Sequence, residues 1–168
     1  MALIYLCLGS NKDDRVGLIQ QATRLLSAED KIRIIRTSTM YETEPWGNKP
    51  QEWFINGIIE AKTKLSPAEL LELCNSVERQ LGRDRTKEDR WSERAIDIDI
   101  LFYDDLVIDT EELRIPHQHL HQRAFAIVPL LELIPDFVHP IYDKTLLELH
   151  DEIEDPEDVF LYGTRIDV

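Results

Sequence analysis

Two aspartates stand two positions apart in an apolar run, Arg94-Ala95-Ile96-Asp97-Ile98-Asp99-Ile100-Leu101. Successive side chains of a β-strand point to opposite faces, so Asp97 and Asp99 would share one face and the isoleucines the other. Their α-carbons would lie about 6.5–7 Å apart, and two such carboxylates can reach a pair of metal ions about 3.5–4 Å apart. The alternative is the exposed polar face of a half-buried strand. The spacing by itself leaves both interpretations open.

Basic side chains crowd the chain just before this pair, at Arg83, Arg85 and Arg94. Arginines beside paired carboxylates are typical of phosphate transfer, in which carboxylates hold Mg²⁺, Mg²⁺ bridges the phosphates and guanidinium groups neutralise developing charge. The alternative is a solvated set of salt bridges, because acidic residues are interleaved with the arginines: Asp84, Glu88, Asp89 and Glu93. The motifs GxxxxGK[ST] and GxGxxG do not occur, so a nucleotide site here would be neither a Walker nor a Rossmann site.

Flat aromatic side chains could hold a planar heterocycle near Thr43 and Asn56, since an asparagine amide offers both a hydrogen-bond donor and an acceptor. The candidates are Trp46, Trp53, Phe54, Trp91 and Phe125. Core packing is the alternative for each of these rings.

The alternating histidines His117, His119 and His121 could in principle bind Zn²⁺. A loop, with a single histidine aimed at a phosphate, fits the basic surroundings better.

Composition limits the partners that this chain can have. Its 168 residues carry a formal net charge of −14, which disfavours binding to nucleic acid and to anionic membranes. The two cysteines, Cys7 and Cys74, fall in apolar patterns typical of buried thiols in a reducing compartment. The sequence shows neither a signal-peptide pattern nor an 18-residue apolar run. We therefore expect a cytoplasmic protein that binds small molecules. We also expect it to be a monomer.

The elements that must position these residues follow from periodicity and capping signals. Strands are expected at 2–8, 32–41, 54–64 and 95–103, with short edge pieces at 106–108 and 113–115. Helices are expected after Asp13 or Asp14, after the capping box of Ser66 and Glu69, from Pro129, and after the capping box of Thr145 and Glu148. The tail beyond the last helix has no assignment.

This order of elements, β-α-β followed by β-α-β, predicts an α+β protein. The expected fold is a ferredoxin-like antiparallel sheet with helices, an α/β/α three-layer sandwich formed by a single domain. A doubly wound fold is the competing possibility, but it needs more βα alternation and usually a glycine-rich first turn. The domain is expected to span residues 1–168, with an acidic C-terminal extension from about residue 145.

The chain resembles the 6-hydroxymethyl-7,8-dihydropterin pyrophosphokinase family between Tyr5 and about Pro140. The resemblance rests on motifs in the same order along the chain: Leu8-Gly9-Ser10-Asn11, Ser38 to Thr43 with Pro45 and Gly47, Phe54-Ile55-Asn56, Glu78 with Gly82-Arg83-Asp84-Arg85, Arg94 to Leu101, Ile115-Pro116-His117, and Arg123-Ala124-Phe125 with Pro129-Leu130. The string through Asp97 and Asp99 is the most specific of them. Ser92-Glu93 and Gln118 depart from the family pattern, which usually has Gly-Pro and often an aromatic residue there.

The resemblance implies the transfer of diphosphate from ATP to the hydroxymethyl group of the reduced pterin, with release of AMP. It implies two Mg²⁺ ions on Asp97 and Asp99, and a catalytic group made of Arg83, Arg94, Asp97 and Asp99. It implies ATP contacts by Glu78, Arg85, His117 and Arg123. It implies a pterin pocket formed by Thr43, Phe54, Asn56, Trp91 and Phe125, in which Trp91 closes over the substrate.

Two other functions remain open at this stage. Ferredoxin-like folds often serve as non-catalytic nucleotide- or anion-binding regulatory modules, which would bind one ligand without Mg²⁺-dependent turnover. A two-metal phosphoesterase would release inorganic phosphate instead of AMP.

Overall fold

The sheet at the centre of the molecule is antiparallel throughout the part of the chain that the structure, a computed structural model, describes: residues 1–47, 50–82 and 95–168. The strands run in the order β5-β1-β4-β3-β8, and β2 also pairs with β4 beyond the end of β3. Their bounds are β1 (Ala2–Ser10), β2 (Ile32–Thr37), β3 (Thr39–Thr43), β4 (Phe54–Thr63), β5 (Asp97–Tyr103) and β8 (Val159–Arg165).

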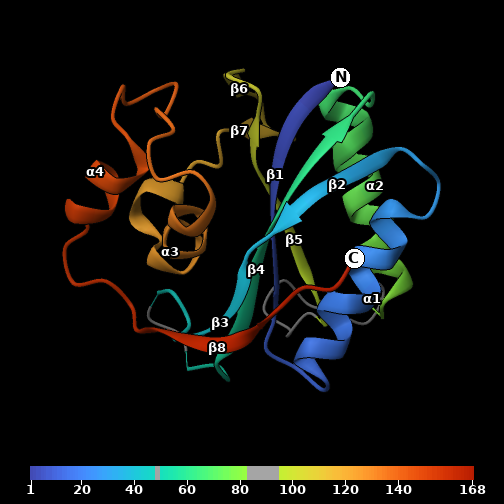
Figure 1. Cartoon of the computed structure of the whole chain (residues 1–168), viewed down its shortest axis with the longest axis horizontal. Helices are drawn as coiled ribbons and strands as arrows, with labels where there is room; N and C mark the ends of the chain where they lie inside the picture. Colours follow the sequence, from blue (N-terminus) through green and yellow to red (C-terminus); the bar gives the residue numbers. More distant parts are fainter. Residues whose placement is uncertain (48–49, 83–94) are drawn as a thin grey trace.

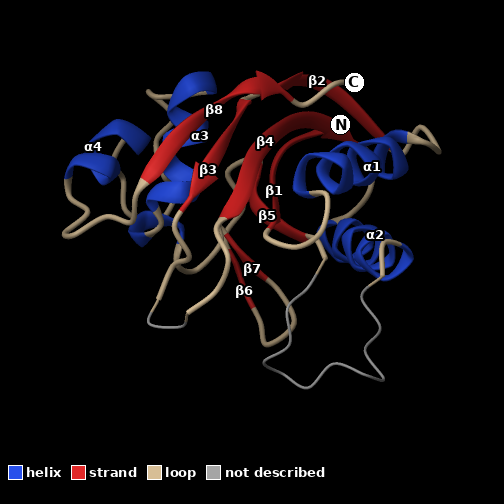
Figure 2. Cartoon of the chain, turned by 90° about the horizontal axis from the view of Figure 1, so that it is seen from below, coloured by secondary structure: helices blue, strands red, loops and turns tan. Residues whose placement is uncertain are grey.

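Helices cover both faces of this sheet and make three layers (Figures 1 and 2). One face carries α1 (Arg15–Ser27) and α2 (Pro67–Gln80), and the other carries α3 (Ala124–Leu133) with the short α4 (Leu146–Asp151). A two-stranded ribbon, β6 (Ile108–Asp109) with β7 (Arg114–Ile115), and a 3₁₀ turn, η1 (Leu120–Gln122), connect β5 to α3. The three-layer α+β fold predicted from the sequence is confirmed.

Local capping explains where three of the helices begin. The Asp14 side chain accepts a hydrogen bond from the Gly17 amide at the start of α1. Ser66 with Glu69 forms the predicted capping box of α2, and Thr145 with Glu148 forms that of α4. Each box satisfies backbone donors that a helix start otherwise leaves unpaired. The positions of these helices were therefore readable from a few adjacent residues.

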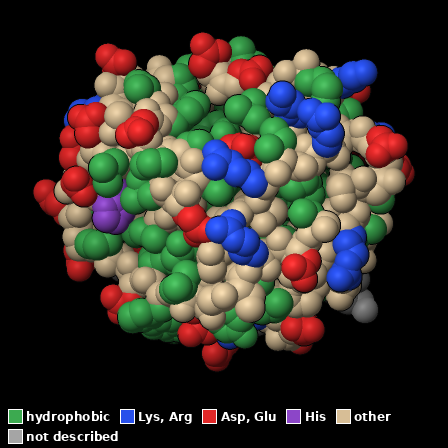
Figure 3. Space-filling model, viewed as in Figure 1, with side chains coloured by type: hydrophobic (Ala, Val, Ile, Leu, Met, Phe, Trp, Pro, Cys, Tyr) green, Lys and Arg blue, Asp and Glu red, His purple; other side chains and the backbone are tan. Residues whose placement is uncertain are grey.

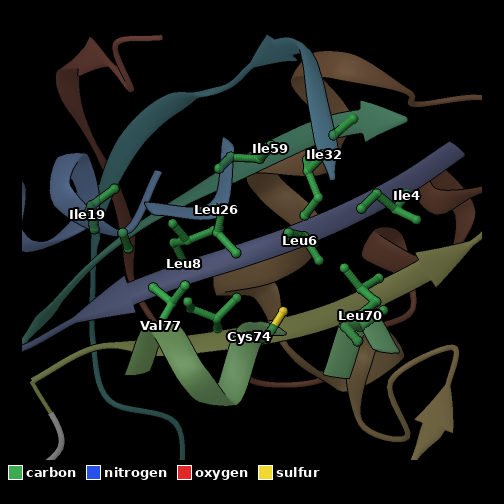
Figure 4. Close-up of a cluster of buried hydrophobic side chains, with 14 of the residues drawn as sticks. Ile4, Leu6, Leu8, Ile19, Leu26, Ile32, Ile59, Leu70, Cys74 and Val77 are labelled. Atoms are coloured by element: carbon green, nitrogen blue, oxygen red, sulfur yellow. The ribbon is translucent and has the colours of Figure 1, made fainter. Parts of the chain in front are cut away.

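Strand β1 shows how the sheet divides the core. Alternate residues such as Ile4, Leu6 and Leu8 pack under α1 and α2, together with Cys74 and Val77 of α2 (Figure 4). The intervening Tyr5 and Cys7 face the layer of α3, where they join Ile127 and Leu130. Both cysteines are buried and free, as expected. Because β1 and β4 are buried almost throughout, the side chains that they present on the α3 side stand on a packed core.

One long strand was expected over residues 32–41, and the structure corrects this. The segment is divided at Ser38 into β2 and β3, which pair with different halves of β4. The Ser38 hydroxyl accepts a hydrogen bond from the Ile58 amide at 2.8 Å, and the Ser38 amide donates to the Ile58 carbonyl at 2.9 Å. A hydrogen bond to the Ser38 side chain therefore replaces one backbone hydrogen bond between the strands. The alternation of residue types in the sequence does not reveal that the strand is interrupted at Ser38.

The helix expected from Pro129 begins five residues earlier, at Ala124, so that prediction of its start was wrong. The Arg123 carbonyl accepts from the amides of both Ala126 and Ile127, which opens the helix before the proline. Pro129 then lies inside α3, where it has no amide proton to donate. Proline also favours the first helical position, so its presence alone does not distinguish a helix start from a helix interior.

The unassigned tail forms β8, an edge strand that pairs with β3. Its exposed side chains include Phe160, Leu161 and Tyr162.

Acidic and basic side chains are interspersed over the face seen in Figure 1, as the space-filling view shows (Figure 3). Within the described residues, no helix has both the length and the apolar character needed to cross a membrane.

Candidate active site

Gly9, near the end of β1, lies between two of the predicted functional residues. In the strand register it is opposite Asn56 of β4 on one side and opposite Asp97 of β5 on the other. Neighbouring strands are about 4.8 Å apart, so the α-carbons of Asn56 and Asp97 lie about 10 Å from each other. The sheet therefore places the candidate pterin-binding amide and the candidate metal ligand on either side of one glycine.

Asp97 and Asp99 share the face of β5 that looks towards α3. Asp99 is opposite Cys7, which packs in the α3-side cluster, while Ile98 and Ile100 face α1 and α2. Both aspartates are half-buried. Burial is the main cause that raises the pKa of the Cys7 thiol, and the negative charge of Asp99 and Asp97 adds to it, opposed by Arg123. The paired-carboxylate face predicted from the spacing is therefore present.

Arg123 brings positive charge to these carboxylates from the start of α3. Its guanidinium lies 4.6 Å from the ring centre of Trp46 and 5.5 Å from that of Phe125. Burial lowers the pKa of Arg123, while Asp99 and Asp97 are among the charges that raise it. Its Nε atom is buried and has no hydrogen-bond partner within the described part of the chain. An arginine that packs against aromatic rings and has an N–H group without a partner is suited to bind an anion.

His117 lies next to Arg123 and is held to β5 by its amide, which donates to the Leu101 carbonyl at 3.2 Å. Burial, followed by the charges of Arg123 and His119, lowers the pKa of His117 to about 4. Its Nδ1 accepts from the His119 amide at 3.4 Å, so in the neutral ring the hydrogen lies on Nε2. His117 is therefore a neutral hydrogen-bond donor at neutral pH.

The predicted pterin-binding residues lie at the ends of three elements. The buried Asn56 donates from Nδ2 to the hydroxyl of the buried Thr43 at 2.6 Å. Phe54 pairs with Thr43 in the register and lies on the same face of β4 as Asn56. Phe125 stands in the first turn of α3, beside Arg123. Four of the five residues expected in the pterin pocket are thus described and lie on the α3 side of the sheet.

Comparisons with known proteins agree with this arrangement. The model of the family described as 7,8-dihydro-6-hydroxymethylpterin-pyrophosphokinase (HPPK) matches residues 5–135. The chain belongs to this family. It is 45% identical over 152 residues to the 2-amino-4-hydroxy-6-hydroxymethyldihydropteridine pyrophosphokinase of Aquifex aeolicus, covering 90% of this chain and 92% of that protein. It is 44% identical over 138 residues to the Methylorubrum extorquens protein of the same name, covering 82% of this chain and 86% of that one.

A solved structure supports the fold independently of close sequence similarity. The crystal structure of Plasmodium falciparum HPPK-DHPS S436F/A437G/A613T triple mutant with STZ-DHP matches with a TM-score of 0.71 at 17% identity. The match covers 90% of this chain and 43% of that chain. The resemblance to the HPPK family stated from the sequence is confirmed.

Several site residues expected from the sequence lie outside the described residues: Arg83, Arg85, Trp91 and Arg94. The prediction that Trp91 closes over the substrate therefore also concerns a residue outside the described ranges. Glu78 is described, and it is buried near the end of α2, in the helical layer on the opposite face of the sheet from Arg123. Its expected role at the border of an ATP site stays a prediction.

The three alternating histidines lie in a loop and a 3₁₀ turn, not on one face of a strand. His117 and His119 lie in the turn before η1 and His121 within it, and the rings of the first two are 6.4 Å apart. Among the described residues, no group of three or more His, Cys, Asp or Glu side chains gathers as a metal site. The loop geometry expected for this segment is confirmed.

Three further residues contact the candidate site but were not among the site residues expected from the sequence. Gly9 is one, because a β-carbon built on it would lie 2.2 Å from Asn56 Oδ1. Trp46 is the second, since it was considered only as one of several aromatic candidates, and it contacts Arg123. Glu157 is the third, because its carboxylate accepts from the Phe125 amide at 2.7 Å. The Gly9-Ser10-Asn11 turn in the sequence could have indicated Gly9. No feature of the residues around Glu157 indicates its contact with Phe125.

Proposed function

We propose that this protein transfers diphosphate from ATP to 6-hydroxymethyl-7,8-dihydropterin, giving the pterin diphosphate and AMP, in folate biosynthesis. The hydroxymethyl oxygen of the pterin forms a bond to the β-phosphorus of ATP, and the bond from that phosphorus to the oxygen bridging it to the α-phosphorus breaks. The hydroxyl proton passes to solvent water as the new bond forms, and AMP departs with the bridging oxygen. The observation that carries this proposal is the placement of Asn56 and Asp97 on the two sides of Gly9.

Magnesium fits the residues that are present. Asp97 and Asp99 offer carboxylate oxygens on one face, and Mg²⁺ is usually held by one or two carboxylates together with substrate phosphates and water. We propose that these two residues hold two Mg²⁺ ions. Bound there, the metal would polarise phosphoryl oxygens and favour loss of the substrate hydroxyl proton. A separate general base is not needed on this account.

The protein's own side chains would position and neutralise the triphosphate. Arg123, with its free Nε donor and aromatic supports, would bind a phosphate oxygen of ATP. His117 would donate from Nε2 without adding a charge. Arg83, Arg85, Arg94 and Glu78 are proposed to complete the catalytic and ATP-binding set on the strength of the family resemblance.

The pterin would lie between the rings of Phe54 and Phe125, with Trp91 closing over it, while Asn56 and Thr43 bind its polar edge. The Asn56–Thr43 hydrogen bond fixes the orientation of the amide, so the pocket meets the heterocycle preorganised. A protein that acts as a monomer in the cytoplasm is part of the same proposal. A non-catalytic regulatory module is not favoured, because named pyrophosphokinases share 44–45% identity over most of the chain.

Two variants test this function directly. Asp97→Asn and Asp99→Asn remove a negative ligand while keeping the side-chain size, so each should reduce Mg²⁺-dependent AMP formation at least about 1,000-fold. Asp105→Asn is the matched control, because Asp105 is exposed just beyond the other end of β5. Circular dichroism should show that all three variants remain folded. Activity of either site variant near that of the control would refute the assignment of the metal ligands.

A further inference from the structure

Helix α3 begins without a side-chain cap of its own. Arg123 stands at the N-cap position, and its side chain makes no capping hydrogen bond. The amide of Phe125, the second residue of the helix, instead donates to Glu157 Oε1 at 2.7 Å. Glu157 therefore caps this helix from 32 residues further along the chain, and its negative charge lies at the positive end of the helix.

The same carboxylate also acts on Arg123. The charge of Glu157 is one of those that raise the pKa of this arginine, which means that it favours the charged form against the cost of burial. Arg123 and Phe125 are two residues apart. In the proposed reaction Arg123 binds a phosphate of ATP, and Phe125 packs against the pterin. One side chain thus supports both a phosphate contact and a ring of the pterin pocket.

The chain fixes Glu157 in place through the residues that follow it. The Glu44 amide donates to the Asp158 carbonyl at 2.9 Å, and the Asp158 amide donates to Glu44 Oε1 at 3.3 Å. Val159 then pairs with Thr43 at the start of β8. Glu157 is therefore anchored to the strand that carries Thr43, and it joins that strand to the start of α3.

A cavity of about 630 Å³ borders this junction, with Glu44, Trp46 and Glu157 in its lining. Trp46 contacts Arg123 from the same loop that Glu44 opens. Asp158 is thus bonded to the loop that carries Trp46, and Glu157 is bonded to the amide of Phe125, the second aromatic residue against Arg123. The segment lies beyond residues 5–135, the part of the chain that matches the HPPK family model.

We propose that Glu157 is a positioning residue for diphosphate transfer. It sets the first turn of α3 so that Phe125 faces the pterin and Arg123 faces the carboxylates of β5. Glu157 itself touches neither substrate. This inference rests on the proposed function, and it gives the C-terminal segment a role in substrate binding.

Three variants separate the parts of this role. Glu157→Ala removes both the acceptor and the charge, whereas Glu157→Gln keeps an oxygen that can accept from the Phe125 amide. Glu154→Ala is the matched control, because Glu154 is an exposed acid of the same segment. Glu157→Ala should raise the KM for the pterin about tenfold, raise the KM for ATP as well because Arg123 is also displaced, and leave kcat within about threefold. Glu157→Gln should recover most of the loss.

Hydrogen exchange at the Phe125 amide gives a readout that needs no turnover. Exchange should accelerate about tenfold or more in Glu157→Ala, less in Glu157→Gln and not at all in Glu154→Ala. Equal KM values and equal exchange in Glu157→Ala and Glu154→Ala would overturn the proposal. A wild-type protein that forms no AMP would refute the proposed function instead, and the exchange rates would still show whether Glu157 holds the helix start.

Discussion

Asn56 Nδ2 donates to Thr43 Oγ1 across 2.6 Å between two adjacent strands, and both residues are buried. On its other side the Asn56 oxygen lies against Gly9, where a β-carbon would come within 2.2 Å of it. The amide is therefore held from both sides in one orientation. A heterocycle with paired donors and acceptors would bind such an amide without the cost of ordering it first.

Replacing Asn56 with Ala should weaken pterin binding by about 1–3 kcal/mol, because polar groups of the bound heterocycle would be left unmatched. ATP binding should change little, since Asn56 lies on the far side of Gly9 from Asp97. Calorimetric titration with each ligand separately checks this. Equal losses for the two ligands would show that Asn56 has a general structural role.

Gly9→Ala should produce a similar selective defect by displacing the Asn56 side chain. Gly57→Ala is the matched control, because Gly57 is also in a central strand but its added β-carbon would meet the flexible end of Ile166 at 2.8 Å. Both variants should lose some stability, by about 1–3 kcal/mol for overpacking. Pterin affinity should fall in Gly9→Ala alone, as titration of the two folded variants would reveal; a comparable fall in Gly57→Ala would contradict this.

Arg123→Lys keeps the charge but loses the planar group that lies over Trp46 and Phe125. Lysine also cannot present the fixed fork of donors that a phosphate accepts. We expect kcat/KM for ATP to fall about 10- to 100-fold, by about 1.4–2.7 kcal/mol of transition-state stabilisation. Steady-state kinetics at saturating pterin would measure this. Unchanged kinetics would mean that the arginine contributes only charge.

His139 should make the protein less stable in mild acid. It is 2% exposed, and burial followed by the charge of His121 lowers its pKa from 6.5 to about 4. Between these values the unfolded chain binds the proton and the folded protein does not, so stability falls as the pH decreases from 6.5 towards 4. The slope contributed by one such group is at most about 1.4 kcal/mol per pH unit.

His139→Asn tests this, because an asparagine oxygen can replace Nδ1 as the acceptor for the Ile141 amide, a bond of 3.1 Å. Urea unfolding at about pH 7 and about pH 5 should show a smaller difference in the variant than in the wild type. Part of the difference should remain, since burial lowers the pKa of His117 in the same direction. An identical difference in the two proteins would exclude His139 as a source.

The sequence was most informative where neighbouring residues decide the structure. The two capping boxes and the alternation through Asp97 and Asp99 each involve a few adjacent positions, and all were found. By contrast, β8 pairs with β3 across more than a hundred residues, and its exposed apolar residues gave no alternation to read. Glu157 was missed for the same reason, because only the folded chain brings it to the Phe125 amide.

Product analysis tests the central claim most directly. The wild-type protein would be incubated with ATP, 6-hydroxymethyl-7,8-dihydropterin and Mg²⁺, and the nucleotides separated over time. We expect AMP to form in step with the pterin diphosphate, and neither to form without Mg²⁺. ADP or inorganic phosphate as the main product, or no turnover with both ligands bound, would contradict the account.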